Sequence, residues 1–488
     1  MNPAGIGQTL PQGVEYVRIL PEIVLSLFGM LIMVLDPLVD ERRSQRLLGF
    51  IALIGSVAAI ASALYQSQYP GLGFWGMVKV DAFSTFFHVL ITAIAAVVIL
   101  SSYEYMEVQR IRAGEYYGLI LFGAVGMCLM SSAVELVLIF IALEISSIST
   151  YVLAGFRRRA AISSEASLKY FLLGSFATAF FLYGVALMFG ATGSTSIAVI
   201  GESLRSNQIP LLAYAGVAFM FVGLGFKVAA APFHIWTPDV YEGAPAPVVG
   251  FMSTAPKAAA FAVLLRLMFE ANAPGRLGLI WVTAALSMTL GNVGALVQQN
   301  VKRLLAYSSI AHAGYVLVAF AALPNNGIPA AMFYTACYAA MNVGAFAVVS
   351  HLAGAGERFV TLDDYAGLGR RSPLLAATLT IFLLSLIGIP MTGGFFAKFY
   401  VFSAALQANL VGLTIIGVLN SAVGAYYYLR VVVYMYMRPA PEAGALPERS
   451  FSTELALAIS TVAVVVLGVL PGITSTWLSR GGAVFLGR

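Results

Sequence analysis

Charge and cysteine are both scarce in this sequence. Only 10% of the residues are Asp, Glu, Lys or Arg, against roughly 25% in an average soluble domain. The two cysteines, Cys128 and Cys337, lie in separate apolar runs far apart in the chain. Their number and spacing exclude a thiolate cluster for iron and do not suit a zinc site. We therefore expect no redox centre, no metal and no cofactor bound by this chain.

Apolar residues take the place of the missing charge. Hydrophobic residues make up 60% of the 488 positions, and many apolar runs have the length of about 20 residues that a bilayer-spanning helix requires. None of them shows the alternating ten-residue pattern of an outer-membrane barrel strand. The sequence therefore predicts an all-α polytopic membrane protein with about fourteen transmembrane helices.

Basic residues are divided unevenly between the loops of this expected fold. Fifteen of eighteen interhelical Lys and Arg residues follow odd-numbered helices, including Arg157, Arg158 and Arg159 after the fifth. By the positive-inside rule, the odd loops are cytoplasmic and both termini lie on the non-cytoplasmic side. The net charge of +5 is modest, and its basic residues lie in loops where they indicate membrane topology. We therefore expect no nucleic-acid binding.

Two features indicate an internal duplication. Tyr151-Val-Leu153 recurs as Tyr315-Val-Leu317 and Tyr170 recurs as Tyr334, both at an offset of 164 residues, which spans five expected helices. An odd number of helices per repeat inverts the second copy, as in many transporters. Glycine and proline also interrupt the seventh and the twelfth helix, one in each half, and such breaks free backbone carbonyls to hold water or a proton carrier. The sequence predicts two inverted five-helix repeats, with broken helices 7 and 12.

Four ionisable residues lie inside apolar runs, where a charge costs from about 3 kcal/mol on insertion scales to more than about 10 kcal/mol in simulations. They are Glu144, Lys227, Lys257 and Lys398. Ionisable residues at such depth mark ion or proton paths, so we expect a chain that moves protons or cations across a bilayer. Snorkelling to an interface is the alternative for a single lysine, and a scaffold with relict charges is the alternative for the whole chain.

Glu144 requires a cationic partner to remain ionised in an apolar run, and Lys227 is the obvious candidate. His234 follows Lys227 by seven residues, and His312 lies in a later apolar run. A histidine can relay protons near neutral pH. It can equally be a satisfied polar residue at a helix end, so His234 and His312 are candidate relays only.

Several long motifs resemble the antiporter-like subunits of respiratory complex I, the NADH-quinone oxidoreductase. The run from Lys227 to Pro247 (KVAAAPFHIWTPDVYEGAPAP) carries the resemblance, together with Leu143-Glu144, Lys257, the segment 300–309 (NVKRLLAYSS) and the segment 388–399 (GIPMTGGFFAKF). The similarity covers roughly residues 115–436. Within that family, the DVYEGAP run at 239–245 is similar to the subunit N branch, the counterpart of the mitochondrially encoded chain 2, more than to the L and M branches.

The resemblance implies a division of the chain and roles for its buried charges. Residues 1–114 would form helices 1–3, residues 115–436 the core of two inverted repeats (helices 4–8 and 9–13), and residues 437–488 a loop and helix 14. On that analogy Glu144 and Lys227 form a modulating ion pair, Lys257 is the central relay, and Lys398 opens toward one side of the membrane.

The same resemblance implies a proton-translocating subunit of the membrane arm, driven by NADH oxidation and quinone reduction in other subunits. FMN, iron-sulfur clusters and quinone are then expected in those partners, and subunits M, K and J and membrane lipids as neighbours, in a bacterial cytoplasmic (inner) membrane. The rival interpretation is a subunit of a secondary cation/proton antiporter without quinone-linked partners. The residues leave open whether protons or sodium ions move.

Overall fold

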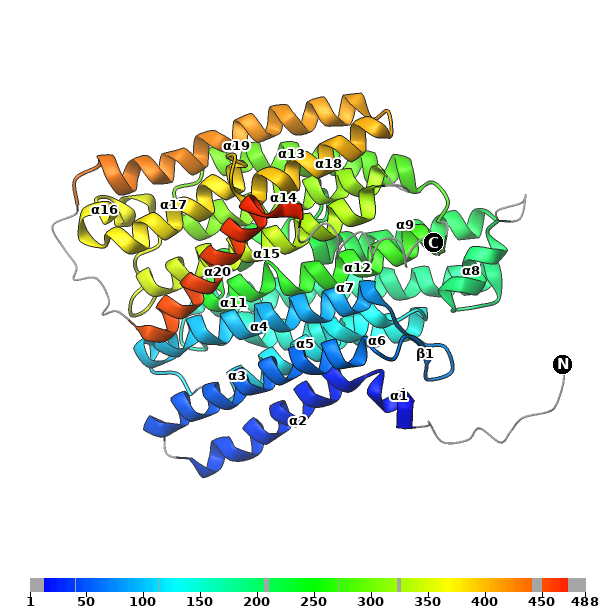
Figure 1. The fold of residues 1–488 in the computed structure, drawn as a ribbon, viewed down its shortest axis with the longest axis horizontal. Coiled ribbons are helices and arrows are strands. Elements are labelled where there is room, and N and C mark those ends of the chain that lie inside the picture. Colours follow the sequence, from blue (N-terminus) through cyan, green and yellow to red (C-terminus); the bar gives the residue numbers. More distant parts are fainter. Residues whose placement is uncertain are drawn as a thin grey trace.

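The computed structural model describes residues 13–39, 41–112, 114–205, 210–271, 273–322, 326–440 and 450–472. Long helices packed side by side make up most of this part of the chain (Figure 1). Within it, the strands are confined to one short antiparallel hairpin, β1 (Gly71–Gly73) and β2 (Val78–Val80), between two helices. The expectation of an all-α membrane protein is therefore confirmed.

The helices form three consecutive groups along the sequence. The first group, blue in Figure 1, precedes the two repeats and consists of α1 (Gly13–Val17), α2 (Leu20–Leu35), η1 (Asp36–Leu38), α3 (Glu41–Gln66) and α4 (Ala82–Gln109). The second consists of α5 (Gly114–Ser132), α6 (Leu136–Ala154), α7 (Ala161–Thr192), α8 (Ile197–Ser203), α9 (Leu211–Val228), α10 (Trp236–Gly243), α11 (Ala246–Met252) and α12 (Ala255–Phe269). The third consists of α13 (Arg276–Leu296), α14 (Val301–Ala321), α15 (Gly327–Leu352), η2 (Leu362–Tyr365), α16 (Leu368–Arg371), α17 (Pro373–Ile387), α18 (Gly393–Gln407) and α19 (Val411–Met437), and α20 (Phe451–Val469) follows it.

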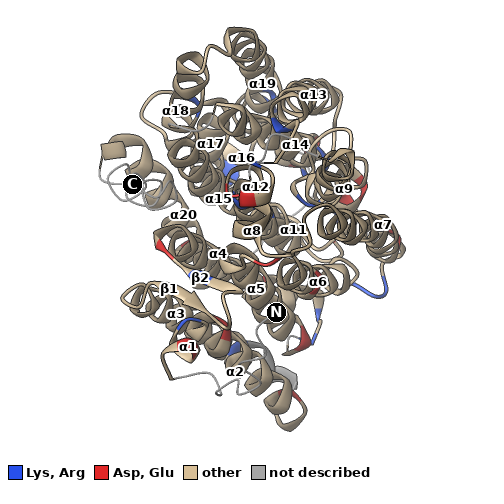
Figure 2. Cartoon of the chain, turned by 90° about the vertical axis from the view of Figure 1, so that its right-hand side faces the viewer, with Lys and Arg blue, Asp and Glu red and all other residues tan. Residues whose placement is uncertain are grey.

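Thirteen helical spans among the described residues are long and apolar enough to cross a membrane. The shorter α17 and α18 follow each other where the twelfth span is expected, which completes the predicted set of about fourteen. The span Ala246–Phe269 is buried throughout and Val301–Ala321 nearly so, whereas much of Val411–Met437 is exposed. Viewed along the helices, α12, α14 and α15 accordingly lie near the middle and α2, α7 and α19 at the edge (Figure 2).

Breaks interrupt the helices where glycine and proline predict them. Helix 7 ends as α9 at Val228, Ala229 has a positive φ of 59°, and the chain resumes as α10. Helix 12 ends as α17 at Ile387, Gly388 has a φ of 94°, and α18 begins at Gly393. The structure also breaks helix 8 at Ser253 and Thr254, between α11 and α12. This third break was not predicted, although Pro256 in the first turn of α12 interrupts the helical hydrogen bonds just before it.

The two ends of the bundle differ in their loops. The arginines of α16 lie at the left-hand end of Figure 1, where α4 and α19 finish and α20 begins. The hairpin and α8 lie at the opposite end. The predicted position of both termini falls on residues outside the described ranges.

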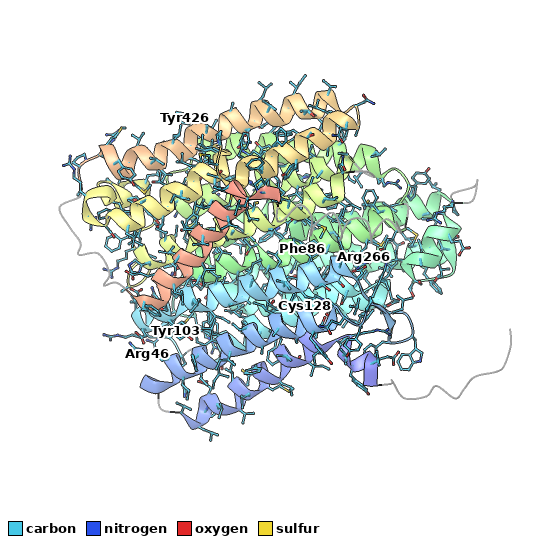
Figure 3. The ribbon with its side chains drawn as sticks, viewed as in Figure 1. Arg46, Phe86, Tyr103, Cys128, Arg266 and Tyr426 are labelled. Carbon is cyan, nitrogen blue, oxygen red and sulfur yellow. The ribbon has the colours of Figure 1, made fainter. Side chains whose placement is uncertain are left out.

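A buried ionic contact joins the first group of helices to α12. Arg266, inside the bundle (Figure 3), places Nη2 3.2 Å from Asp81, which caps α4, and donates from Nε to the carbonyl oxygen of Ser131 on α5 at 3.1 Å. Burial alone would raise the pKa of Asp81, but the guanidinium of Arg266 and the hydrogen bonds of Ser84 hold that pKa below its ordinary value. This charge is therefore paired and serves the packing of α4, α5 and α12.

Candidate functional site

Lys227 is the penultimate residue of α9, at the edge of the first break. Its Nζ donates to Oγ of Ser147 on α6 at 2.9 Å, and it lies 5.9 Å from the ring centroids of both Tyr151 and Tyr170. The Ser147 hydroxyl donates its own proton to the carbonyl oxygen of Leu143 at 2.7 Å. The ammonium is thus held by a neutral hydroxyl and two aromatic faces, and the break in helix 7 brings it to the interior.

Glu144 lies on α6, one turn before Ser147, and its Oε1 is buried without a hydrogen-bond partner. The ion pairs within 4.0 Å in the described part of the chain do not include one between Glu144 and Lys227, although the two charges are close enough for a Coulomb interaction. In this conformation Lys227 is bonded to Ser147. The expected Glu144–Lys227 ion pair is therefore not formed as a direct contact in this conformation.

Lys257 lies in the first turn of α12, directly after the unpredicted break in helix 8. Its Nζ donates to Oγ of Ser309 on α14 and, at 3.2 Å, to the carbonyl oxygen of the same residue. Tyr338 on α15 donates its hydroxyl to Ser309 Oγ at 2.8 Å. Lys257 therefore belongs to a network of hydroxyls, and the described residues place no carboxylate within ion-pair distance of it.

His312 lies one turn after Ser309 on α14 and is buried. Its Nδ1 is 2.8 Å from the hydroxyl of Tyr334, and its Nε2 is 3.2 Å from the hydroxyl of Tyr428. Its ring centroid lies 5.2 Å from that of Tyr338, whose hydroxyl reaches Ser309. The structure therefore brings His312 next to the network that holds Lys257.

Lys398 lies on α18, in the second half of broken helix 12. Its Nζ donates to the carbonyl oxygen of Ile387 at 2.7 Å, to that of Leu386 at 3.1 Å and to Oγ of Ser421 at 2.7 Å. Ile387 ends α17, so the ammonium sits at the negative end of a helix dipole. Gly388 permits this approach, because a Cβ there would lie 3.1 Å from Cδ of Lys398 and its φ of 94° disfavours any side chain.

Three of the four tyrosines that indicate the internal repeat lie beside a buried lysine. Tyr151 and Tyr170 face Lys227. Their counterparts in the second half are Tyr315, whose ring lies 4.9 Å from Nζ of Lys398, and Tyr334, which is bonded to His312. The ring of Tyr315 is also 5.7 Å from that of His312. Each broken helix thus presents a lysine to the first tyrosine of the repeated pair, whereas the second tyrosine contacts the lysine in the first half and His312 in the second.

His234 stands apart from these contacts. It lies between α9 and α10, half-buried, and its Nδ1 has no hydrogen-bond partner. The described hydrogen bonds connect it to none of the three lysines. Of the six candidate residues, the structure groups Glu144 with Lys227 and joins Lys257, His312 and Lys398 through tyrosines and serines.

Sequence reasoning missed the neutral side chains that hold the charges. Ser147 and Ser309 carried a usable signal, since each lies one helical turn from a candidate residue, Glu144 or His312, on the same helix. Tyr428 and Ser421 had no such signal, because they come from α19, far along the sequence. Their role depends on how α19 packs against α14 and α18.

A second charged cluster was also missed. The carboxylate of Glu357 lies 2.8 Å from Nζ of Lys302 and 2.9 Å from Nη1 of Arg157. It also accepts from the hydroxyl of Tyr105 at 2.8 Å and from the backbone N–H of Ala246 at 2.7 Å. Glu357 therefore links α4, the loop before α7, the start of α11 and the start of α14, and we assign it a structural role.

The sequence of this chain is similar to a known family profile and to named bacterial proteins. A family profile described as the NADH:quinone oxidoreductase/Mrp antiporter transmembrane region matches residues 133–424. A Koribacter versatilis protein named NADH-quinone oxidoreductase subunit N 2 is 67% identical over 94% of this chain and 95% of its own length. A Trichlorobacter lovleyi protein named NADH-quinone oxidoreductase subunit N is 46% identical over 96% of this chain and 97% of its own length.

Two solved structures share the fold. A chain of respiratory complex I from Thermus thermophilus superposes with a TM-score of 0.82 at 38% identity, covering 94% of this chain and all of that chain. A chain of the Mrp complex from a Dietzia species gives a TM-score of 0.83 at 18% identity, covering 96% of this chain and 97% of that one. The second likeness concerns the fold alone.

Proposed function

The chain belongs to the NADH:quinone oxidoreductase/Mrp antiporter transmembrane family, and we propose that it carries protons through Lys227, Lys257 and Lys398 as a membrane-arm subunit of an NADH-quinone oxidoreductase. The energy comes from NADH oxidation and quinone reduction elsewhere in the complex. Residues 115–436 form the antiporter-like core, which includes the matched region 133–424. Residues 1–114 and 437–488 flank it.

The observation that carries this proposal is that three buried lysines are held by neutral partners. Their exposed fractions are 4% for Lys227, 2% for Lys257 and 8% for Lys398. Their hydrogen-bond acceptors are serine hydroxyls and backbone carbonyls. Burial disfavours the charged form of a lysine and a nearby carboxylate favours it. Such a residue can gain or lose its proton when a neighbouring charge moves, whereas a lysine locked to a carboxylate cannot.

Glu144 supplies the movable charge in this scheme. Because its Oε1 is unpaired and Lys227 is bonded to Ser147, a change of the Glu144 rotamer can bring the carboxylate to the ammonium or take it away. Approach of the carboxylate loads a proton on Lys227, and withdrawal releases it. The released proton then passes toward Lys257.

The remaining steps follow the polar groups between the lysines. Ser146 Oγ on α6 and Asn342 Oδ1 on α15 are buried without a protein hydrogen-bond partner, and Asn342 Nδ2 donates to Oγ of Ser253 at the break directly before α12. Buried polar atoms of this kind hold water, which supports proton transfer from Lys227 to Lys257. His312 and the tyrosine hydroxyls around it continue the route to Lys398. His234 is outside this route.

Partners and location follow from the same assignment. We place the chain in a bacterial cytoplasmic membrane with its arginine-rich end toward the cytoplasm. Its neighbours are the other membrane-arm subunits, among them M, K and J, and the FMN, iron-sulfur clusters and quinone lie in partner subunits. The secondary antiporter without quinone-linked partners is the weaker alternative, because relatives 67% and 46% identical to this chain carry the oxidoreductase name, whereas the Mrp chain is 18% identical.

Alanine variants in the assembled complex test the route. Lys227→Ala, Lys257→Ala and Lys398→Ala should each depress proton uptake and quinone reduction in proteoliposomes together, since a blocked route stalls the cycle. Lys169→Ala is the matched control, because Lys169 is an exposed lysine paired with Glu165 and Asp239. Subunit content on native gels shows whether each variant has assembled. Normal pumping by all three assembled lysine variants would refute the proposal.

A further inference from the structure

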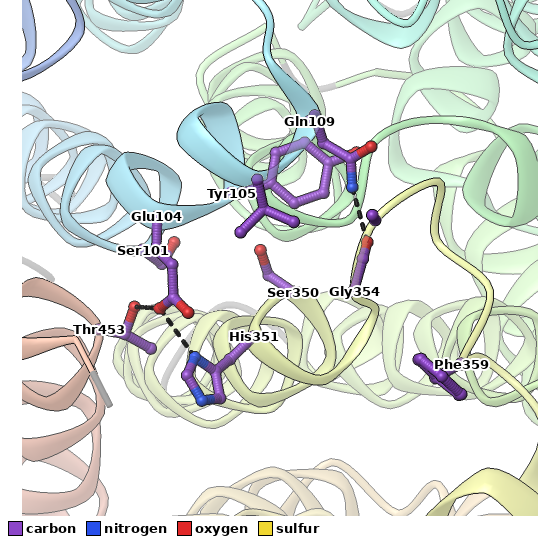
Figure 4. Close-up of a pocket in the computed structure, with 11 residues that line it drawn as sticks. Ser101, Glu104, Tyr105, Gln109, Ser350, His351, Gly354, Phe359 and Thr453 are labelled. Atoms are coloured by element: carbon purple, nitrogen blue, oxygen red, sulfur yellow. Dashed lines mark hydrogen bonds and ion pairs between the residues drawn. The ribbon is translucent and has the colours of Figure 1, made fainter. Parts of the chain in front are cut away.

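Two cavities meet at the end of the bundle where α4 and α15 finish and α17 and α20 begin. The first, of about 250 Å³, is lined by polar residues that include Ser101, Glu104, Gln109 and Ser350. The second, of about 260 Å³, runs between α17 and α20. His351 and Thr453 belong to the walls of both. Figure 4 shows the polar cavity with these two residues on one side.

The polar cavity contains a built acidic site. Oε2 of Glu104 is 2.8 Å from Nδ1 of His351 and accepts from the hydroxyl of Thr453 at 3.2 Å. Ser350 lines the same cavity, is only 5% exposed, and has an Oγ without a hydrogen-bond partner. None of the described residues that line this cavity is Lys or Arg. Its chemistry therefore suits a cationic group with hydrogen-bonding neighbours rather than an anion.

The second cavity exposes mostly apolar atoms, although Glu454 and Thr461 also line it. Leu375 and Leu457 form its inner wall, and Leu374 and Val462, which are exposed, form its rim. Because this chain spans a membrane, the large apolar side chains exposed on these helices face the hydrocarbon of the bilayer. An occupant of this cavity is therefore apolar along its length and enters from the bilayer.

We propose that the two adjoining cavities bind one membrane phospholipid with an ammonium-bearing headgroup. The ammonium binds Glu104. The phosphate ester lies against the Ser350 hydroxyl and the His351 ring, and an acyl chain lies between α17 and α20. A headgroup that carries only negative charge would meet Glu104 and Glu454 with no lysine or arginine among the described lining residues, and His351 is already bonded to the Glu104 carboxylate at 2.8 Å. The lipid would join α4, the second repeat and the last helix, and it has no part in the proton route.

Photo-crosslinking of the purified complex tests this site. The complex is exchanged into phosphatidylethanolamine that carries a photoactivatable acyl chain, irradiated and mapped by peptide mass spectrometry, in parallel with phosphatidylglycerol that carries the same chain. We expect phosphatidylethanolamine to label peptides from α17 and α20 and phosphatidylglycerol to label them much less. Equal labelling by both lipids would overturn the headgroup assignment, and no labelling of α17 and α20 would overturn the site.

Two variants separate the polar and the apolar half. Glu104→Gln should reduce labelling by phosphatidylethanolamine roughly tenfold or more, the size expected for loss of a charge-assisted hydrogen bond. Ala458→Trp should block the apolar half, because Ala458 lines it and is exposed, so that a larger side chain displaces no packed group. Ile459→Trp is the control on the same helix, since Ile459 is exposed and outside the cavity. Unchanged labelling in both Glu104→Gln and Ala458→Trp would overturn the proposal even in a fully assembled complex.

Discussion

Replacing Ser147 by alanine tests the structure of the proton route at a residue that carries no charge. The Ser147 hydroxyl accepts from Nζ of Lys227 at 2.9 Å and donates to the carbonyl oxygen of Leu143 within its own helix. Alanine keeps α6 intact and removes the hydrogen-bond acceptor of the ammonium. Ser147→Thr keeps a hydroxyl at the same place and is the matched control.

The expected size follows from the kind of bond that is lost. A hydrogen bond to a charged group contributes about 1.5–3 kcal/mol, and about 1.4 kcal/mol corresponds to a tenfold change in proton affinity. Ser147 Oγ is the one protein hydrogen-bond acceptor that the described contacts give to Lys227. Its loss should therefore favour the neutral lysine by roughly one to two powers of ten. If Lys227 must hold a proton in each cycle, the alkaline limb of the pumping profile moves to lower pH by about one to two units.

Proton uptake by proteoliposomes that contain the assembled complex measures this shift. NADH oxidation by an artificial acceptor that bypasses the membrane arm normalises for the amount of complex. Ser147→Ala should pump poorly at neutral pH and recover as the pH falls, while Ser147→Thr follows the wild type. An unchanged profile in assembled Ser147→Ala would refute the assignment of Lys227 as a proton carrier whose charge Ser147 stabilises.

Three further predictions concern orientation, stability and the second lysine site. A single cysteine introduced in the Arg157–Arg159 loop should react with an impermeant reagent only when the cytoplasmic side is accessible, and labelling in intact cells would reverse the orientation. Burial alone would raise the pKa of Glu357, but Lys302 and Arg157 hold it below its ordinary value. The ionised Glu357 carboxylate therefore stabilises the folded protein fully above the ordinary carboxyl pKa. This stabilisation is lost as the pH falls through the lowered pKa of Glu357 in the folded state. Glu357→Gln should thus lower the thermal inactivation temperature of the complex at neutral pH, with a difference that shrinks in acid, and an equal difference at all pH values would contradict this pairing. Gly388→Ala should impair pumping more than Gly412→Ala, because a Cβ at Gly388 lies 3.1 Å from Lys398 whereas one at Gly412 meets nothing within 4 Å; equal pumping by both variants would refute the role of this close approach.

The number of helices and two of their breaks could be predicted because they depend on local sequence. A run of about twenty apolar residues has one way to cross a bilayer, and Gly388 and Pro232 interrupt helices by their own backbone chemistry. The positions of Lys227, Lys257 and Lys398 inside the protein followed from the same runs. The break at Ser253 and Thr254 was missed although it also has a local cause, because Pro256 in the first turn of α12 cannot donate a backbone hydrogen bond to residue 252.

The partners of the charges could not be predicted, because they depend on the rotation of each helix about its axis. Glu144 and Ser147 are three residues apart, about 60° around the helix, so a modest rotation of α6 decides which of the two faces Lys227. Glu357 was missed for another reason. It lies in a polar loop with a positive φ of 52°, and charged loop residues are usually solvated. Here the loop folds inward, and three basic or hydroxyl side chains converge on its carboxylate.

Lys227→Arg is the most direct test of whether the buried lysines give up their protons. Arginine keeps the positive charge and can bind Ser147 and Glu144, but it holds its proton too tightly to release it near neutral pH. Proton uptake and quinone reduction are measured together in proteoliposomes on complex whose subunit content matches the wild type. We predict that both activities fall nearly as far as in Lys227→Ala. Near-normal pumping by fully assembled Lys227→Arg complex would show that this charge is only a structural partner of the α6 helix, and would contradict the proton route proposed here.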